Sequence, residues 1–509
     1  MSDTNNKRIA RNTLFLYVRM LLVMAVSLYT SRIILAALGV TDFGIYNVVG
    51  GVVAFLGFLN SSMSNAVQRF LSFELGRNDG AKTNHVFCSA LIAHFSIAVF
   101  IVIVLELVGS WFISNQLNIP PNRLCAAKWV FQCSVITSFF SILQVPYNAI
   151  IIAKERMGVY AYLSILEVLF KLVIVYFLLI ISYDRLITYA VLHAIVTIGV
   201  LQFYRIYCSK KFIEAKFRLV RDYSTLKEIG SFAVWNLIGE FAWSVTNQGV
   251  SFVINVFVGP VVNAAQGVSV QVNTAVMRFV SNFQTALNPQ IIKSYSSSAL
   301  EDMSKLISRG SRLSFFLLLL LSLPLIFEMD YVLHLWLKEV PDYAREFCQM
   351  MLICSLVMTA TNLLVTIIRA TGNIREYQFV TAILLLFNFP LSWFVLKIGM
   401  PPYTVIISLT LVQIINGCIR LYYVKKLVNY PIRSFVCFDL AKMIVVLLIS
   451  STPFIILKQF CMQGTYRFVL SVLFTGMVVI LSSYMFGLER KEKIEIYNAF
   501  VRKWNHFRK

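Results

Sequence analysis

Long apolar runs, separated by short polar loops, follow one another along almost the whole chain of 509 residues. Most are long enough to cross a bilayer as a helix, which needs about 20 apolar residues. Hydrophobic residues make up 58% of the sequence and charged residues 14%, against roughly 25% charged in a soluble domain. We therefore expect an all-α polytopic membrane protein. Fourteen spans are predicted, and twelve spans are the alternative. The fourteen lie at 12–38, 43–66, 86–113, 124–152, 158–181, 185–208, 228–257, 260–288, 311–329, 344–369, 377–397, 402–424, 436–458 and 465–487.

The basic residues predict an orientation for these spans. The formal net charge is +21, and 33 of the 45 Lys and Arg residues fall in the two tails and the alternate loops that share one side. Only eight fall on the other side. Because basic loops stay on the cytoplasmic side, both termini are expected in the cytoplasm. Four bases remain at membrane depth, namely Arg19, Arg32, Lys171 and Arg278.

A weak internal repeat divides the chain. "IIAKERMGVYAY" at 151 aligns with "IRATGNIREYQF" at 368, and "LGVTDFGIYNVV" at 38 aligns with "VGPVVNAAQGVS" at 258. The pattern predicts two pseudo-symmetric six-helix lobes at 1–222 and 223–433, followed by an extra helix pair and basic tail at 434–509. Each half has an even number of spans, so the repeats are parallel and a cavity is expected between them.

A polar stripe marks the eighth span. Its residues are spaced by three and four positions and therefore share one helical face: Gln271, Thr274, Arg278, Ser281, Thr285 and Asn288. Asn65 and Gln68 lie toward the same end of the second span, its repeat partner. A polar face is costly against lipid, so these side chains either line a cavity or form hydrogen-bonded helix contacts.

Other charged side chains also lie within predicted spans. Glu240 is a candidate for ion coupling or for pairing with Arg278, and Glu167 and Lys171 are four residues apart, as in a helical ion pair. Arg19 and Arg32 point to different faces of one helix, so they cannot form one clamp. Each is a candidate for binding substrate in the cavity or for reaching the interface.

Several classes of function are not supported by any motif. The sequence has no GxxxxGK[ST] phosphate loop, no HExxH, no GxSxG and no Cys/His metal spacing. We therefore expect no catalytic residues, no metal site, no cofactor and no enzymatic activity. No nucleic-acid-binding signature interrupts the spans, so we expect no nucleic-acid partner.

The stretch "SRIILAALGVTDFGIYNVVGGVVAFLGFLNSSMSNAVQRFLSFELGR" resembles the opening of the polysaccharide exporters. These are O-antigen-type lipid-linked oligosaccharide flippases of the multidrug/oligosaccharidyl-lipid/polysaccharide (MOP) superfamily. The resemblance implies a V-shaped, MATE-like pair of lobes that flips undecaprenyl-pyrophosphate-linked repeat units by alternating access. It places the protein in the bacterial inner membrane, in O-antigen, capsule or exopolysaccharide synthesis. The implied partners are the lipid-linked oligosaccharide, membrane lipids, and the polymerase and chain-length machinery.

Three alternatives stay open. Arg19, with Asp42 in "TDFG", resembles the lipid II flippases, although this second helix carries no base before Arg69. A cation-coupled exporter of small molecules or drugs would use Glu240. A scaffold of a polysaccharide assembly complex would not transport at all.

Overall fold

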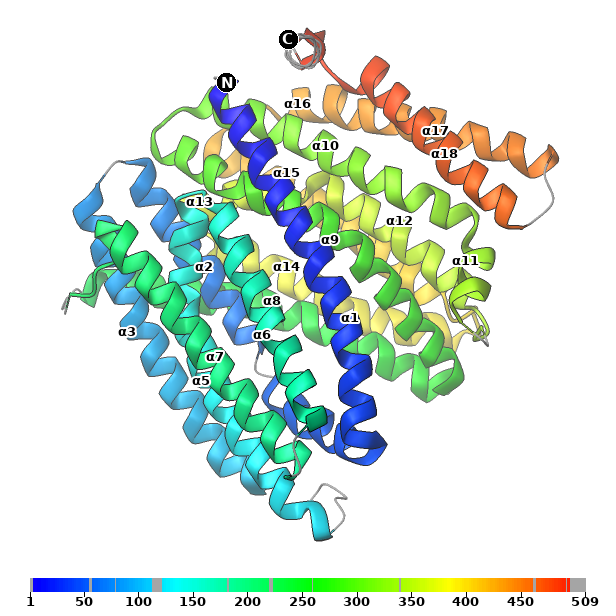
Figure 1. The fold of residues 1–509 in the computed structure, drawn as a ribbon. Helices are drawn as coiled ribbons and strands as arrows, with labels where there is room; N and C mark the ends of the chain where they lie inside the picture. The colour runs from blue at the N-terminus through cyan, green and yellow to red at the C-terminus, as the bar shows by residue number, and fades with distance from the viewer. Residues whose placement is uncertain are drawn as a thin grey trace, which may run out of the picture. The chain divides into compact units, whose positions relative to one another are not determined.

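The fold is built from long helices, as the computed structural model shows (Figure 1). The structure describes residues 3–54, 57–77, 79–111, 121–180, 183–218, 223–258, 260–337, 340–460, 464–490 and 492–494. No strand occurs within these ranges. An all-helical chain is what a bilayer imposes, because every backbone polar group must find a partner inside its own segment. The predicted all-α class is therefore confirmed.

The helices form two compact units. Unit 1 comprises Met1–Phe241 and Thr285–Leu300, and unit 2 comprises Ala242–Gln284 and Glu301–Lys509. The long helices α8 and α9 each contribute to both units. These units are defined by packing, whereas the predicted lobes at 1–222 and 223–433 rest on the repeat and stay a prediction.

Unit 1 contains six whole long helices and parts of two others. The elements are α1 (Asp3–Ala54), α2 (Gly57–Gly76), α3 (Gly80–Val104), η1 (Leu105–Gly109), η2 (Pro121–Arg123), α5 (Leu124–Ala153), α6 (Met157–Ile180), α7 (Arg185–Lys211), η3 (Ile213–Ala215), the first half of α8 (Tyr223–Val258) and the end of α9 (Pro260–Ser296). A core of buried residues from α1, α3, α5 and α7 includes Val49, Ala98 and Val130. A smaller cluster joins α1 to α6 through Ile34 and Val175.

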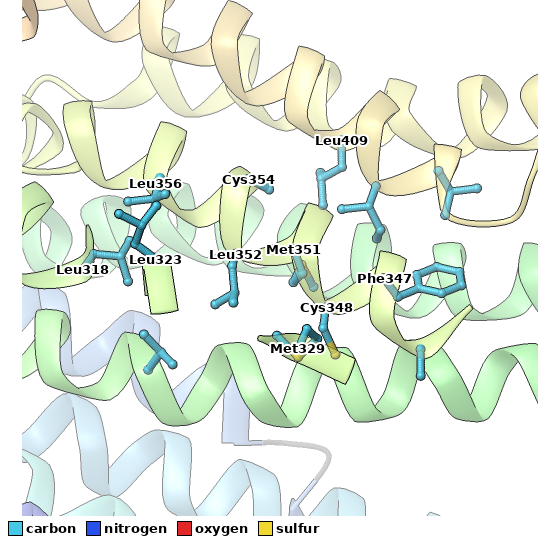
Figure 2. Packing of buried hydrophobic residues seen from close by; sticks show 14 of the residues in the cluster. Leu318, Leu323, Met329, Phe347, Cys348, Met351, Leu352, Cys354, Leu356 and Leu409 are labelled. Carbon is cyan, nitrogen blue, oxygen red and sulfur yellow. The ribbon is translucent and has the colours of Figure 1, made fainter. Parts of the chain in front are cut away.

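Unit 2 contains the remaining helices. They are α10 (Leu300–Phe327), α11 (Met329–Trp336), α12 (Ala344–Asn362), α13 (Leu364–Thr371), α14 (Arg375–Lys397), α15 (Thr404–Val428), α16 (Ile432–Ser434), η4 (Phe435–Leu440), α17 (Ala441–Phe460), α18 (Thr465–Ser482) and η5 (Ser483–Gly487). Figure 2 shows part of the core, where Leu318 and Leu323 of α10 lie near Leu352 and Leu356 of α12. The predicted C-terminal helix pair is present as α17 and α18, which lie side by side (Figure 1).

Apolar side chains also cover the outside of the helices. Along α14, for example, Phe379, Ile383, Phe387 and Phe394 are all more than half exposed. Within the described residues, eight helices are long and apolar enough to cross a membrane, or nine if the bent pair α12 and α13 is one span. The chain is thus a multi-pass membrane protein.

One predicted boundary is wrong. The spans expected at 12–38 and 43–66 are not separated by a loop at 39–42, because helical structure runs without interruption from Asp3 to Ala54. The stretch contains no proline, so its backbone can keep helical hydrogen bonds. Figure 1 shows α1 changing direction near its far end. The axis of α1 therefore bends while the helix continues.

The internal repeat reappears in the helix ends. α2 ends at Gly76 and α3 begins at Gly80, while α9 ends at Ser296 and α10 begins at Leu300, so both boundaries keep the offset of 220 found between the aligned segments. At the offset of 217, Glu155 after α5 (φ 58°) corresponds to Gly372 after α13 (φ 79°). Both helices thus end on a left-handed residue, a common way to stop a helix.

Candidate functional site

The predicted stripe on α9 is largely exposed. Gln271, Thr274, Arg278 and Ser281 are exposed side chains of unit 2. The Thr274 hydroxyl donates to the carbonyl of Val270 (2.7 Å) and the Ser281 hydroxyl to that of Arg278 (3.1 Å). Arg278 forms no ion pair with any side chain that the structure describes. Thr285 and Asn288, the last two stripe residues, are half-buried and belong to unit 1.

A neighbouring face of α9 carries polar contacts that the sequence did not single out. Asn273 accepts a hydrogen bond from Ser355 (2.6 Å), and Gln284 accepts one from Asn362 (2.9 Å). Both partners lie on α12. This face packs against α12, whereas the stripe is exposed. Helical spacing alone could not distinguish the polar side chains of the two faces.

Arg19 lies against α6 in unit 1. Its guanidinium carbon is 4.4 Å from the centre of the Tyr160 ring, within the range of a cation–π contact. Its Nε is buried and has no hydrogen-bond partner among the described residues. Tyr204, buried in α7, is close enough for the charges of Arg19 and Glu167 to act on it. Arg19 is therefore part of a polar region within unit 1, and its buried Nε donor has no acceptor among the described residues.

Glu167 and Lys171 form the expected contact on α6. The Lys171 Nζ donates to Glu167 Oε1 at 2.8 Å, and both side chains are a little under a third exposed. His193 of α7 lies near this pair, within reach of the Lys171 charge. Neutralisation within the pair lowers the cost of holding two charges at membrane depth.

Asp42 has a partner that the sequence did not identify. Arg123, at the start of α5, donates from its Nε to Asp42 (2.8 Å) and from Nη1 to Asp184 (2.6 Å). One guanidinium therefore joins α1 to the starts of α5 and α7. Asp42, predicted as a residue for ion coupling or for structural pairing, is thus paired with Arg123, and its role stays a prediction.

The remaining predicted residues are less informative. Asn65 and Gln68 are half-buried on α2, and Gln68 Nε2 is buried without a hydrogen-bond partner in the described part of the chain. The side chain of Arg32 lies outside the described residues. Glu240 is half-buried in unit 1, whereas Arg278 belongs to unit 2. Pairing between Glu240 and Arg278 therefore stays a prediction.

The ends of α2 and α9 meet in unit 1, which sequence reasoning missed. We call this the α2–α9 contact, and it comprises Gly76, Phe73, Lys293, Tyr295 and Ser296. A Cβ built on Gly76 would lie 2.9 Å from the Cα and carbonyl oxygen of Lys293 and 1.8 Å from the Ser296 hydroxyl. The rings of Phe73 and Tyr295 are 6.4 Å apart. Only glycine allows so close an approach.

A buried carboxylate fastens this contact to the turn after α5. Glu155 Oε1 accepts from Lys293 Nζ at 2.7 Å, and its Oε2 accepts from Gln290 Nε2 at 3.0 Å. The Glu155 side chain is only 1% exposed. The one clue in the sequence was the position of Glu155 in the repeated segment "IIAKERMGVYAY". That position did not reveal that Glu155 would contact Lys293 and Gln290.

These helices and their order match a known fold. The fold is that of the MATE transporters of the MOP superfamily. A multidrug resistance MATE family transporter in its outward-facing conformation is 12% identical, with a TM-score of 0.71 over 83% of this chain and 95% of the other. A Vibrio cholerae MATE transporter is 15% identical, with a TM-score of 0.72 over 84% of this chain and 97% of that one.

A third solved structure shares this fold. It is a MOP superfamily transporter from Pyrococcus furiosus, described by a binding pocket of reverse polarity that suggests a different function. It is 13% identical, with a TM-score of 0.70 over 85% of this chain and 96% of its own.

Sequence comparisons give two more specific matches. The MatE family model matches residues 240–394. The uncharacterized membrane protein EpsK of Bacillus subtilis (strain 168) is 22% identical over 305 residues. That alignment covers 59% of this chain, and the chain spans 59% of the length of EpsK.

Proposed function

We propose that this protein is a membrane transporter that flips lipid-linked oligosaccharides across the bacterial inner membrane by alternating access. Arg278 carries the proposal, because it is an exposed guanidinium in the middle of the polar stripe on α9. Its planar fork of donors suits a pyrophosphate. The neighbouring amide and hydroxyl groups of Gln271 and Thr274 suit sugar hydroxyls. Polymerase and chain-length proteins are the expected partners.

The balance of charge supports an anionic head group. Arg19 has a buried donor without a partner among the described residues, and an anionic oxygen would satisfy it. Arg278 carries a second positive charge within a predicted span. A cationic drug would instead favour carboxylates at these positions. The resemblance of residues 31–77 to the polysaccharide exporters points to the same substrate class.

The α2–α9 contact supports the proposed cycle. It joins helix ends that the positive-inside pattern assigns to the cytoplasm. Alternating access needs such a contact to open when substrate enters from that side. Lys293 and Glu155 form the ion pair that must then break. In this proposal the pair belongs to the gate, and Arg278 belongs to the binding site.

A second candidate is a cation-coupled exporter of small molecules. Glu240 favours it, because a half-buried carboxylate within an apolar helix is suited to binding a proton or cation. The fold is also shared with a multidrug resistance transporter. A substitution of Glu240 can therefore distinguish the exporter from the flippase.

The test replaces Arg278 by Ala, Lys and Glu in the native host and measures surface polysaccharide at matched protein level. Flipping of a pyrophosphate substrate predicts severe loss with Glu, loss with Ala and partial retention with Lys. Lys305→Ala, at an exposed base on α10, is the matched control. Normal polysaccharide in the Glu variant, together with drug sensitivity in Glu240→Gln, would favour the exporter.

A further inference from the structure

A cavity of about 530 Å³ opens in unit 1. Leu91 and Phe95 of α3 and Leu143 of α5 supply an apolar part. Arg205 of α7 and Lys216, just after η3, supply positive charge. The volume is within the range of small-molecule sites. An apolar wall beside two bases matches an amphiphilic anion better than a soluble one.

The charges of the two bases are not paired within the part of the chain that the structure describes. Arg205 and Lys216 are both exposed, and neither forms an ion pair with a carboxylate in the described part of the chain. Glu214, the acid nearest in sequence to Lys216, is engaged by Lys154, whose Nζ lies 2.7 Å from its Oε1. The positive charge at the cavity is therefore available to a ligand.

The segment that carries Lys216 is held in place rather than loosely attached. The buried side-chain amide of Asn84 donates to the carbonyl oxygens of both Glu214 and Lys216, each at 2.8 Å. The backbone N–H of Arg218 also lies 3.3 Å from the sulfur of Cys88. Two residues of α3 thus fix the position of this wall of the cavity.

The same segment has the composition of a membrane-surface element. Ile213 is 78% exposed and Phe217 is 59% exposed, while Lys216 and Arg218 present charge beside them. Apolar and basic side chains side by side are typical of chain that lies at the boundary of an anionic leaflet. The basic-residue pattern assigns this loop to the cytoplasmic side.

We propose that this cavity binds an anionic phospholipid of the adjacent leaflet. The lipid phosphate lies on Arg205 and Lys216, and an acyl chain lies along Leu91, Phe95 and Leu143. Basic pockets between membrane helices on the cytoplasmic side suit lipid head groups. The cavity shares no lining residue with the stripe that carries the proposed function, and the proposal does not depend on what the protein transports.

Native mass spectrometry of the full chain in detergent tests this site, with equimolar phosphatidylglycerol and phosphatidylcholine as probes. We expect the wild type to retain phosphatidylglycerol preferentially. Arg205→Gln or Lys216→Gln should each weaken that preference about fivefold, which is the effect of one base near an anionic surface. The double variant should weaken it roughly 25-fold. Lys210→Gln, at an exposed base of α7 outside the cavity lining, is the control and should change it less than about twofold.

Ser209→Trp gives a second readout, because it fills the cavity and keeps both bases. It should also remove the preference for phosphatidylglycerol, and thermal unfolding should show that each variant is folded. Equal binding of the two lipids, or an unchanged preference in the double variant, would overturn the proposal. Full displacement by inorganic phosphate would assign the cavity to a small anion instead. Stronger binding of undecaprenyl phosphate would assign it to a polyprenyl lipid.

Discussion

Asp184 joins two kinds of interaction at the start of α7. Its Oδ1 accepts from the backbone N–H groups of Leu186 (3.0 Å) and Ile187 (3.2 Å), which caps the helix. Its carboxylate also pairs with Arg123. Burial alone would raise the pKa of Asp184, but the hydrogen bonds from Arg123 and from the backbone outweigh it and hold the pKa below its usual value.

We predict that the two interactions can be separated by substitution. Asp184→Asn keeps a side-chain cap and loses the charge, whereas Asp184→Ala loses both, and the missing cap costs about 1 kcal/mol. Thermal unfolding in detergent at pH 7 should therefore give the order wild type, Asn, Ala. Equal unfolding temperatures for Asn and Ala would remove the capping role.

The charge of Asp184 also predicts a dependence on pH. Because its pKa is lower in the folded protein, the ionised carboxylate stabilises the fold above the unfolded-state pKa of about 3.9. That contribution disappears as the pH falls through the folded-state pKa. The difference in unfolding temperature between wild type and Asp184→Asn should therefore shrink below about pH 4. A difference that stayed constant there would contradict this assignment.

At the scale of the elements, the α2–α9 contact depends on a missing side chain. Gly76→Ala places a methyl group 2.9 Å from backbone atoms of Lys293, so the two helix ends must separate. In a cysteine-free background, the buried position 292 as Ile292→Cys should then react faster with a water-soluble maleimide.

A glycine four residues away supplies the control. A Cβ on Gly80 would meet nothing within 4 Å, so Gly80→Ala should leave the labelling rate unchanged. Glu155→Gln should speed labelling less than Gly76→Ala, because it removes the charge and keeps an acceptor for Gln290. Equal rates in all variants would show that this contact is not held by close packing.

The C-terminal helix pair is attached through buried charges. Arg467 of α18 donates from both Nε and Nη2 to Glu328, each at 2.8 Å, and Ser471 adds a third hydrogen bond to the same carboxylate. At the other end, the guanidinium of Arg312 in α10, only 1% exposed, pairs with Asp439 and Glu492. These contacts hold α17 and α18 to the rest of unit 2.

We predict that breaking one side of the Arg467–Glu328 pair is worse than removing both. Arg467→Met leaves Glu328 buried without its partner, which costs roughly 3–5 kcal/mol. The double variant Arg467→Met, Glu328→Met should recover most of that loss, because no uncompensated charge remains. Thermal unfolding of both variants measures the difference. Equal destabilisation would mean that the pair contributes no more than packing.

At the scale of the whole molecule, one experiment can test the orientation of the chain in the membrane. The unequal distribution of Lys and Arg predicts that both termini lie in the cytoplasm. A green fluorescent protein at the C-terminus should therefore be fluorescent. Alkaline phosphatase fused at position 338 should be active, and the same enzyme fused at position 297 should be inactive. The reverse pattern would invert the topology.

The sequence by itself determined the class of protein and the positions of most helices. Apolar length fixes a membrane helix because the bilayer leaves the backbone no other partners. The ion pair of Glu167 and Lys171 was equally accessible, since residues four apart on one helix are always neighbours. The repeat was visible as well, and its offset recurs in the ends of α2 and α9.

Only the tertiary structure decided which helices these side chains meet. Arg123 finds Asp42 across 81 residues, Arg19 lies over Tyr160, and Lys293 meets Glu155. Helical periodicity determines which residues share a face, but it carries no information about the helix that the face will meet. That choice depends on how the helices pack, and it separates the exposed stripe on α9 from the polar contacts beside it.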